Sequence, residues 1–274
     1  EWPNYRLLSH ANSTSGLSGI RGVIMIVLKT SRELAIMREA CRISAKALKL
    51  AGEAVEPGVS TWEIDRIVRR VIEEEGGKPN FLGYGGFPGS ACVSVNDVVI
   101  HGIPHKEIIL KEGDIVSIDT GAFYDGFNGD NAYTFPCGDV SEEAKRLMDV
   151  TRESLFEGIK AAQAGARVGD IGSAVQRYVE ARGYSVVRDF VGHGVGEKLH
   201  EDPSVPNYGT PGRGVRLLPG MTIAIEPMIN AGVKEVKTLE DGWTTVTADG
   251  KLSAHFEHTI AITPDGPVIM TLPE

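Results

Sequence analysis

The sequence has little cysteine and no long apolar run. Its 274 residues include three cysteines, Cys41, Cys92 and Cys137, and no two of them form a Cys-x-x-Cys pair. An odd number of dispersed cysteines does not suggest a disulfide framework and fits the reducing cytoplasm, where we expect the protein to work. No apolar stretch approaches the roughly 20 residues that cross a bilayer, so we expect a soluble protein without a membrane partner.

Positive charge is also scarce. Lys and Arg number 28 against 37 Asp and Glu, which gives a formal net charge of −9. Proteins that bind nucleic acids or anionic membranes need clustered Lys and Arg, so the composition argues against both kinds of partner. The glycine-rich stretch at 83–89 lacks the Gly-x-Gly-x-x-Gly fingerprint and opens no helix pattern, so nucleotide binding is not expected either.

Residues 1–24 differ in composition from the rest of the chain. They are rich in Ser, Asn and Gly, show no periodic pattern, and lack the basic start and long apolar core of a signal peptide. We interpret them as an added tail or a disordered extension, with Met25 as the native start. A content of 42% hydrophobic residues suffices for a buried core. Residues 25–274 are predicted to form a single domain, because the internal duplication described below suggests two similar halves packed around one site.

Four segments have the capping residues and apolar spacing of helices. Thr30 and Ser60 are each followed three residues later by Glu, which is a capping-box pattern, and apolar residues then recur every three or four positions. Two further helices are predicted to begin at Ser141 and Asp170. Each half of the chain therefore has two predicted helices followed by strands.

The two halves also resemble each other in sequence. Residues 113–119, Gly-Asp-Ile-Val-Ser-Ile-Asp, lie 107 positions before residues 220–226, Gly-Met-Thr-Ile-Ala-Ile-Glu. The same offset places Gly58 on Gly165. A constant offset across helices and strands indicates an internal duplication, so we expect two similar halves that share one site.

A carboxylate ends both duplicated runs, Asp119 in the first half and Glu226 in the second. A buried ionised carboxylate costs several kcal/mol unless a cation balances it. The Asp-Gly turn at 125–126 predicts a hairpin that puts Asp130 directly opposite Asp119 or one diagonal step away, on the same face. In the second half, strands near 221–226 and 253–262 are expected to place Glu257 against Glu226 in the same way.

One imidazole completes the predicted metal centre. His193 lies between glycines, which let the backbone approach closely. An isolated strand Asp is more often a turn or edge residue, and an isolated His is more often a hydrogen-bonded loop residue. Four carboxylates and one imidazole together form a hard, oxygen-rich set that suits Mn, Fe, Co or Zn in a two-metal site.

Motifs in order from about residue 30 to the end resemble the type I methionine aminopeptidases. They are His101-Gly102-Ile103-Pro104, Asp119, Asp130, Gly192-His193-Gly194-Val195-Gly196, His200-Glu201, Ile225-Glu226-Pro227-Met228 and Phe256-Glu257-His258-Thr259. The resemblance implies an α/β (α+β) pita-bread fold, in which two pseudo-symmetric halves form an antiparallel sheet covered by helices. It also implies a cytoplasmic monomer that removes the N-terminal methionine from nascent proteins when the second residue is small, in transient contact with the ribosome.

The resemblance assigns roles to individual residues. Asp130 and Glu257 would bridge two divalent ions, Asp119 would complete one site, and His193 with Glu226 the other. Glu226, His101 and His200 would be catalytic. The methionine pocket would be lined by Phe81, Tyr84, Phe87, Cys92, His101, Leu199, His200 and Trp243. A monovalent cation would lie at Asn96, Val98 and Ser253.

Some positions leave alternatives open. The Asp-x-Gly at 119–121 also occurs in Xaa-Pro aminopeptidases and prolidases of the same fold, so such a peptidase is one alternative. A catalytically inactive binding module is another, although all five ligand positions are present. His255 stands where the family commonly has Gln, and we interpret it as a surface residue. The native metal and the occupancy of the second metal site are not predicted.

Overall fold

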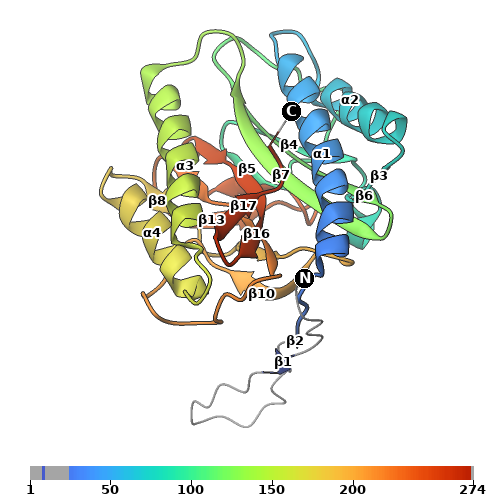
Figure 1. The fold of residues 1–274 in the computed structure, drawn as a ribbon. Helices are drawn as coiled ribbons and strands as arrows, with labels where there is room; N and C mark the ends of the chain where they lie inside the picture. Colours follow the sequence, from blue (N-terminus) through green and yellow to red (C-terminus); the bar gives the residue numbers. More distant parts are fainter. Residues whose placement is uncertain (1–7, 10–24, 273–274) are drawn as a thin grey trace.

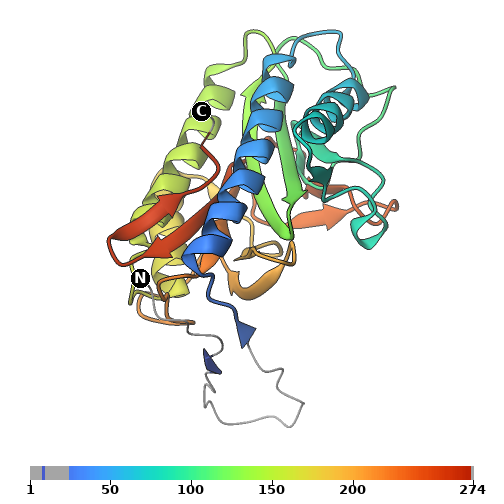
Figure 2. The ribbon, with the colours of Figure 1, turned by 45° about the vertical axis from the view of Figure 1, so that its right-hand side comes forward.

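The computed structural model describes residues 8–9 and 25–272 (Figures 1 and 2). Strand β1 (Leu8–Ser9) pairs antiparallel with β2 (Met25–Ile26). β1 falls within residues 1–24, where the sequence shows no strand pattern, and the rest of that segment lies outside the described residues. The interpretation of 1–24 as a tail, with Met25 as the native start, stays a prediction.

The four predicted helices are all present. They are α1 (Ser31–Glu53), α2 (Thr61–Glu74), α3 (Glu142–Ala161) and α4 (Val168–Glu180), and the short 3-10 turn η1 (Tyr84–Gly86) lies in the glycine-rich stretch. The Glu33 carboxylate accepts the Thr30 N–H at 2.7 Å, and the Ser60 box is built in the same way. Helix α4 begins two residues earlier than predicted, because Asp170 is its third residue and accepts the Arg167 N–H at 2.7 Å. In the described part of the chain, no helix is long and apolar enough to cross a membrane.

A nine-stranded antiparallel sheet forms the centre of the molecule, in the order β10-β9-β11-β16-β7-β6-β3, with β17 added to β16 and β4 to β6. Its strands are β3 (Lys78–Pro79), β4 (Ala91–Val95), β6 (Ile115–Tyr124), β7 (Phe127–Pro136), β9 (Gly192–Gly194), β10 (Glu201–Val205), β11 (Thr222–Ile225), β16 (Glu257–Thr263) and β17 (Gly266–Ile269). Two three-stranded sheets contain β5 (Val98–Ile100), β8 (Ser185–Val186), β12 (Met228–Asn230), β13 (Val236–Thr238), β14 (Thr245–Thr247) and β15 (Ser253–His255).

The strand predicted at 253–262 is divided in two. β15 pairs with β12, whereas β16 pairs with β11 and β7, so the chain passes from one sheet to another at Phe256. The Phe256 ring is buried against Tyr133, with ring centroids 4.5 Å apart. The interruption therefore reflects a change of pairing partner.

The helices pack against the central sheet, with α1 in contact with β6 and β7, and α3 in contact with β11 and β16 (Figure 2). Because successive strand residues point to opposite faces, Ile118 joins the core that includes Ile64 of α2, while Asp119 lines a cavity. In the second half Ile225 joins the core that includes Leu155 of α3, and Glu226 lines the same cavity. Each duplicated run therefore buries an isoleucine in the core and turns its last carboxylate to the cavity.

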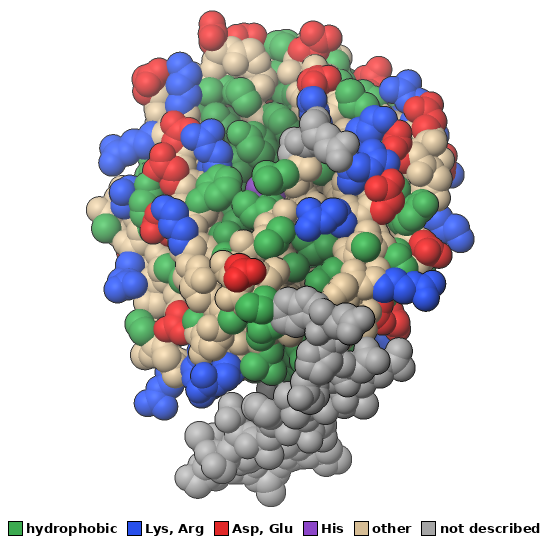
Figure 3. All heavy atoms as spheres, in the orientation of Figure 1, with side chains coloured by type: hydrophobic (Ala, Val, Ile, Leu, Met, Phe, Trp, Pro, Cys, Tyr) green, Lys and Arg blue, Asp and Glu red, His purple; other side chains and the backbone are tan. Residues whose placement is uncertain are grey.

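The outer surface carries charges of both signs. On the face seen in Figure 3, Lys and Arg are interspersed with Asp and Glu. On α3, residues three apart form pairs of opposite charge: Lys145 binds Glu142 at 2.8 Å and Lys160 binds Glu157 at 2.7 Å. Such exposed pairs contribute at most about 1 kcal/mol each, so they add little to the stability of the fold.

The predicted duplication is visible in the backbone. Helices α2 and α4 begin 107 residues apart, as do strands β6 and β11. Isolated bridges join Ser60 to Ile109 and, at the same offset, Arg167 to Arg216. Three matched glycine pairs have positive φ angles: 98° and 89° at Gly58 and Gly165, 80° and 83° at Gly76 and Gly183, and 90° and 92° at Gly113 and Gly220. The two halves therefore follow one backbone plan.

Candidate metal centre and adjoining pocket

The first pair of carboxylates comes from the β6–β7 hairpin. Asp125 and Gly126 form its turn with φ angles of 45° and 93°. Asp119 is paired with Ala132, and Asp130 is paired with Gly121, so the two acids are diagonal neighbours. The predicted hairpin and its diagonal register are confirmed.

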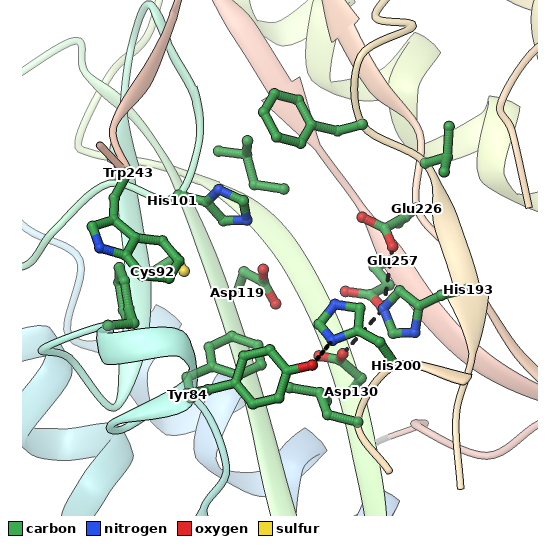
Figure 4. Close-up of a pocket in the computed structure, with 16 residues that line it drawn as sticks. Tyr84, Cys92, His101, Asp119, Asp130, His193, His200, Glu226, Trp243 and Glu257 are labelled. Atoms are coloured by element: carbon green, nitrogen blue, oxygen red, sulfur yellow. Dashed lines mark hydrogen bonds and ion pairs between the residues drawn. The ribbon is translucent and has the colours of Figure 1, made fainter. Parts of the chain in front are cut away.

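The second pair differs in register. Strands β11 and β16 pair as far as Ile225 with His258, and beyond them Met228 pairs with His255 in the same register. Glu226 follows β11 directly, and Glu257 is the first residue of β16. They therefore face one another directly, whereas Asp119 and Asp130 are diagonal. Figure 4 shows all four carboxylates around one cavity.

The Nε2 atom of His193 faces these acids. Its Nδ1 lies 2.8 Å from the Gly194 carbonyl oxygen, which only accepts hydrogen bonds. In a neutral ring Nδ1 therefore carries the proton, and Nε2 has a lone pair. That Nε2 lies 3.7 Å from Asp130 Oδ2 and 3.5 Å from Glu226 Oε1. A lone pair that faces two carboxylates needs a cation between them.

The electrostatics of the cluster also call for a cation. Asp119 Oδ1, Asp130 Oδ1 and Glu257 Oε1 are buried without a hydrogen-bond partner among the described residues. Burial raises the pKa of Asp119 to about 7, and burial with mutual repulsion raises the pKa of Asp130, Glu226 and Glu257 well above the ordinary values. Burial also lowers the pKa of His193 to about 3. One ligand atom from each of Asp130, His193 and Glu257 falls in a group whose members all lie within 4.8 Å of one another, so these residues fit divalent metal binding.

An apolar pocket opens on this cluster. The cavity measures about 160 Å³ and is lined by all five predicted ligands and all eight predicted pocket residues. Phe81, Phe87, Cys92 and Leu199 are buried together, with Trp243 packed against them. Sequence reasoning missed three lining residues, Ile100, Phe190 and Val191. Their only local signal is position, because they adjoin His101 or the Gly192-His193-Gly194 motif.

The two other predicted active-site histidines lie on opposite sides of the cavity (Figure 4). The His200 ring centroid is 4.1 Å from that of His193, and His200 Nδ1 is 2.8 Å from the Tyr84 hydroxyl. His101 has a φ of 60° and packs edge-on against Phe190, with ring centroids 5.4 Å apart. Burial lowers the pKa of His101 to about 4, so its imidazole ring is neutral at pH 7.

A buried ion pair holds the loop that carries His200. Lys29 Nζ lies 2.5 Å from Glu201 Oε2, with side chains 2% and 9% exposed. Gly196 makes room for this pair, because a Cβ there would collide with Glu201 Oε1 and the end of Lys29. The glycine-rich motif around His193 therefore also serves the neighbouring loop.

The residues predicted to bind a monovalent cation lie beside one another, outside the cavity lining. The Ser253 N–H donates to the Asn96 carbonyl at 2.9 Å, and Val98 lies on β5, which contacts β15. The Ser253 hydroxyl is 2.8 Å from Asn230 Oδ1. Their role as cation ligands stays a prediction.

The interpretation of His255 as a surface residue is wrong. His255 is 1% exposed, and burial lowers its pKa to about 3. Its Nε2 lies 3.8 Å from Glu226 Oε2. The reason is that β15 is covered by contacts from distant strands, with the His255 N–H donating to Thr134 Oγ1 on β7.

Comparison with known proteins defines the class. The model of metallopeptidase family M24 matches residues 35–264, and the chain belongs to this family. Within it, the chain is 56% identical over 248 residues to the methionine aminopeptidase of Clostridium perfringens, covering 90% of this chain and 99% of that protein. The predicted family resemblance is confirmed.

Solved structures give the same result. The crystal structure of methionine aminopeptidase from Thermotoga maritima matches with a TM-score of 0.90 and 49% identity, over 91% of this chain and 100% of that one. The prolidase from Pyrococcus furiosus matches with a TM-score of 0.73 and 26% identity, and only 66% of that chain is covered. The pita-bread fold is confirmed, and the similarity favours the aminopeptidases over the prolidases.

Proposed function

We propose that the chain is a metal-dependent aminopeptidase that removes the N-terminal methionine from new proteins whose second residue is small. The observation that carries this proposal is the apolar cluster of Phe81, Phe87, Cys92 and Leu199, which opens directly on the carboxylates and His193 in one cavity. A volume of about 160 Å³ compares with the roughly 150 Å³ cavity that binds one benzene molecule. The site therefore accepts one medium-sized apolar side chain beside the reacting bond.

The metal ligands we assign are Asp119, Asp130, His193, Glu226 and Glu257. Family M24 consists of metallopeptidases, and we infer that these residues would hold two divalent ions per chain, with Asp130 and Glu257 as ligands common to both. Cobalt, manganese, iron and zinc all suit this donor set. When bound, such ions polarise a carbonyl oxygen and lower the pKa of water towards neutrality.

The protein's own groups move the protons. The Glu226 carboxylate takes the proton that the attacking water loses, because it is buried at the cavity wall and its two neighbours within ion-pair distance, His193 and His255, have pKa values that burial lowers to about 3. We assign the Tyr84 hydroxyl, 2.8 Å from His200 Nδ1, as the donor of that hydrogen bond, and this assignment puts the imidazole proton on Nε2. His200 then donates a hydrogen bond to the oxyanion that develops at the scissile carbonyl.

The remaining groups orient the substrate. His101, on the far side of the cavity, contacts the scissile amide nitrogen. Asp119 receives the free α-amine, so only the first residue of a chain is removed. The side chain of that residue lies among Cys92 and the aromatic rings, which suit a polarizable thioether. The second residue meets the narrow space near His101, and must be small.

Several further properties belong to the same proposal. The substrates are the N-terminal segments of nascent polypeptides, met in the cytoplasm by a monomer in transient contact with the ribosome. A monovalent cation at Asn96, Val98 and Ser253 would tie the loop after β4 to β15, because these residues come from separate segments that meet there.

Three peptides test the function. With Mn²⁺ or Co²⁺ added, kcat/KM for Met-Ala-Ser is expected to exceed that for Met-Lys-Ser by about 100-fold, since pocket misfit costs about 1 to 3 kcal/mol per methylene-sized change. Ala-Pro-Ala is expected to be a poorer substrate still. Faster cleavage of Ala-Pro-Ala than of Met-Ala-Ser would make the protein an Xaa-Pro peptidase. Metal binding without cleavage of any of the three would favour a binding module.

A further inference from the structure

His255 is a buried imidazole without a hydrogen-bonding partner for Nε2. Among the described residues, no group lies within hydrogen-bond distance of that atom. The backbone of His255 is fixed on both sides, because its N–H donates to Thr134 Oγ1 at 2.9 Å and its carbonyl accepts from the same hydroxyl at 2.8 Å. β15 is also paired with β12, where His255 faces Met228. The backbone of His255 is therefore fixed, and the residue is buried, with 1% of it exposed.

The acceptor that Nε2 faces is the Glu226 carboxylate. His255 Nε2 lies 3.8 Å from Glu226 Oε2, while Glu226 Oε1 lies 3.5 Å from His193 Nε2. Glu226 is thus placed between two imidazoles, one for each of its oxygens. His255 does not line the cavity, whereas all five assigned ligands do. This placement suits a residue that contacts a ligand and is not itself one.

A buried ring nitrogen without a hydrogen-bond partner costs about 1 to 3 kcal/mol. The group that His255 Nε2 faces is a carboxylate, which accepts hydrogen bonds, so we place the ring proton on Nε2. At 3.8 Å the nitrogen is beyond hydrogen-bond distance of Glu226 Oε2, so the proposed bond requires the two groups to move closer. Carboxylates that bind metals are commonly oriented by such outer hydrogen bonds. The backbone of Glu226 is already fixed, because its carbonyl accepts from Asn207 Nδ2 at 3.0 Å. The carboxylate is the part that still needs to be oriented.

We propose that His255 is a positioning residue for Glu226, whose Nε2–H donates to Glu226 Oε2 and keeps Oε1 turned towards His193. This inference rests on the proposed function of Glu226 as ligand and proton acceptor. Without the donor, the Glu226 carboxylate can adopt a second orientation. Metal affinity and the rate of proton transfer to Glu226 then both decrease.

Two nearly isosteric variants isolate the donor. His255→Gln keeps an N–H donor at the end of the side chain, whereas His255→Met fills a similar volume without one. His258→Met is the matched control, because His258 is a neighbouring histidine whose Nδ1 is bonded to Thr271 Oγ1 at 2.9 Å and which does not line the cavity. Each protein is stripped with a chelator and measured for Mn²⁺ affinity by calorimetry, and then for kcat and KM on Met-Ala-Ser.

Loss of the donor should lower Mn²⁺ affinity and kcat by about 10-fold or more in His255→Met, the usual range for an outer partner of a metal ligand. KM should stay within about 2-fold, because His255 does not line the pocket. His255→Gln and His258→Met should stay near the parent protein in both properties.

Several results would overturn the proposal. Parent-like affinity and kcat in His255→Met would show that no donor is needed. A loss of metal in His255→Gln equal to that in His255→Met would make His255 a ligand, and a changed visible spectrum of the Co²⁺ form would support that reading. If both variants fail to fold, the role of His255 is structural. Inactivity of the parent protein would refute the proposed function, while the affinity comparison would still decide the role of His255.

Discussion

The two halves share a backbone and differ in the side chains and insertions that it carries. In the first half the two acids belong to one hairpin with a two-residue turn, and they lie diagonally across the β6–β7 pair. In the second half the acids are glutamates, they face one another directly, and β12 to β15 are inserted between them. β4, which carries Cys92, and β9, which carries His193, occupy the same place beside β6 and β11.

The difference separates two tasks. The repeated elements place one pair of carboxylates from each half on one cavity. Segments outside the repeat supply the apolar part of the cavity lining: the stretch before β4 brings Phe81, Tyr84 and Phe87, and the insertion before β16 brings Trp243. The duplication therefore accounts for the placement of the four carboxylates, and the segments outside the repeat account for the apolar side of the cavity.

The largest effect is expected from removing a shared charge. Asp130→Asn should lower kcat on Met-Ala-Ser by about 10³-fold or more, because two cations would lose a bridging anion. Steady-state kinetics with added Mn²⁺ measure this directly.

Asp125→Asn is the matched control, because it makes the same change in the turn of the same hairpin, where the residue is exposed and has a φ of 45° that Asn tolerates. It should leave kcat unchanged. Near-normal turnover in Asp130→Asn would refute the two-metal account.

The next largest effect is expected from removing one active-site histidine from each half. His101→Ala and His200→Ala should each lower kcat by roughly 10²-fold while metal content stays at the parent level, because each would remove one contact to the reacting amide. Loss of metal in either variant, measured by elemental analysis, would show that the histidine is a ligand.

A smaller effect is expected from removing the metal, which would leave the four buried carboxylates without a balancing cation. Asp119 has a folded pKa of about 7, above its unfolded value near 3.9, so its contribution to stability is present at low pH and is lost as pH rises through about 7. Asp130, Glu226 and Glu257 act in the same direction, because their pKa values are also raised. The lowered pKa values of His193 and His255 destabilise the fold only below about pH 6.5, where the unfolded chain takes up the protons.

The chelator-treated protein should therefore have a Tm that falls as pH rises from 6.5 to 8, and Mn²⁺ should remove that trend. Differential scanning calorimetry at several pH values provides the measurement. A metal-free Tm that rises over this range would contradict the repulsion inferred among the acids.

The smallest effect tests the duplication. Gly58 and Gly165 have φ angles of 98° and 89°, and no atom lies closer than 3.9 Å to a Cβ built at either. Gly58→Ala and Gly165→Ala should each lower the free energy of unfolding by about 1 kcal/mol through strain alone, with activity unchanged. Urea unfolding should give equal losses. Unequal losses would mean that the matched turns are not equivalent.

The sequence predicted features that depend on local pattern. The capping boxes at Thr30 and Ser60, the Asp-Gly turn and the spacing of Asp119 and Asp130 are all read within a few residues of one another, and the structure has each of them. The family resemblance added the pocket residues. The burial of His255 was missed because it depends on Thr134, which is 121 residues away in the sequence. The break at Phe256 is likewise set by pairing with β12 and β11, which no local pattern records.

The central claim is that one metal centre is shared by the two halves. Elemental analysis of Asp130→Asn and Glu257→Gln, loaded with Mn²⁺ beside the parent protein, tests it most directly, because each variant removes one carboxylate from a different half. The account predicts two ions per chain in the parent protein and a similar loss of metal in both variants. Full metal content in either variant would confine metal binding to one half and contradict the account.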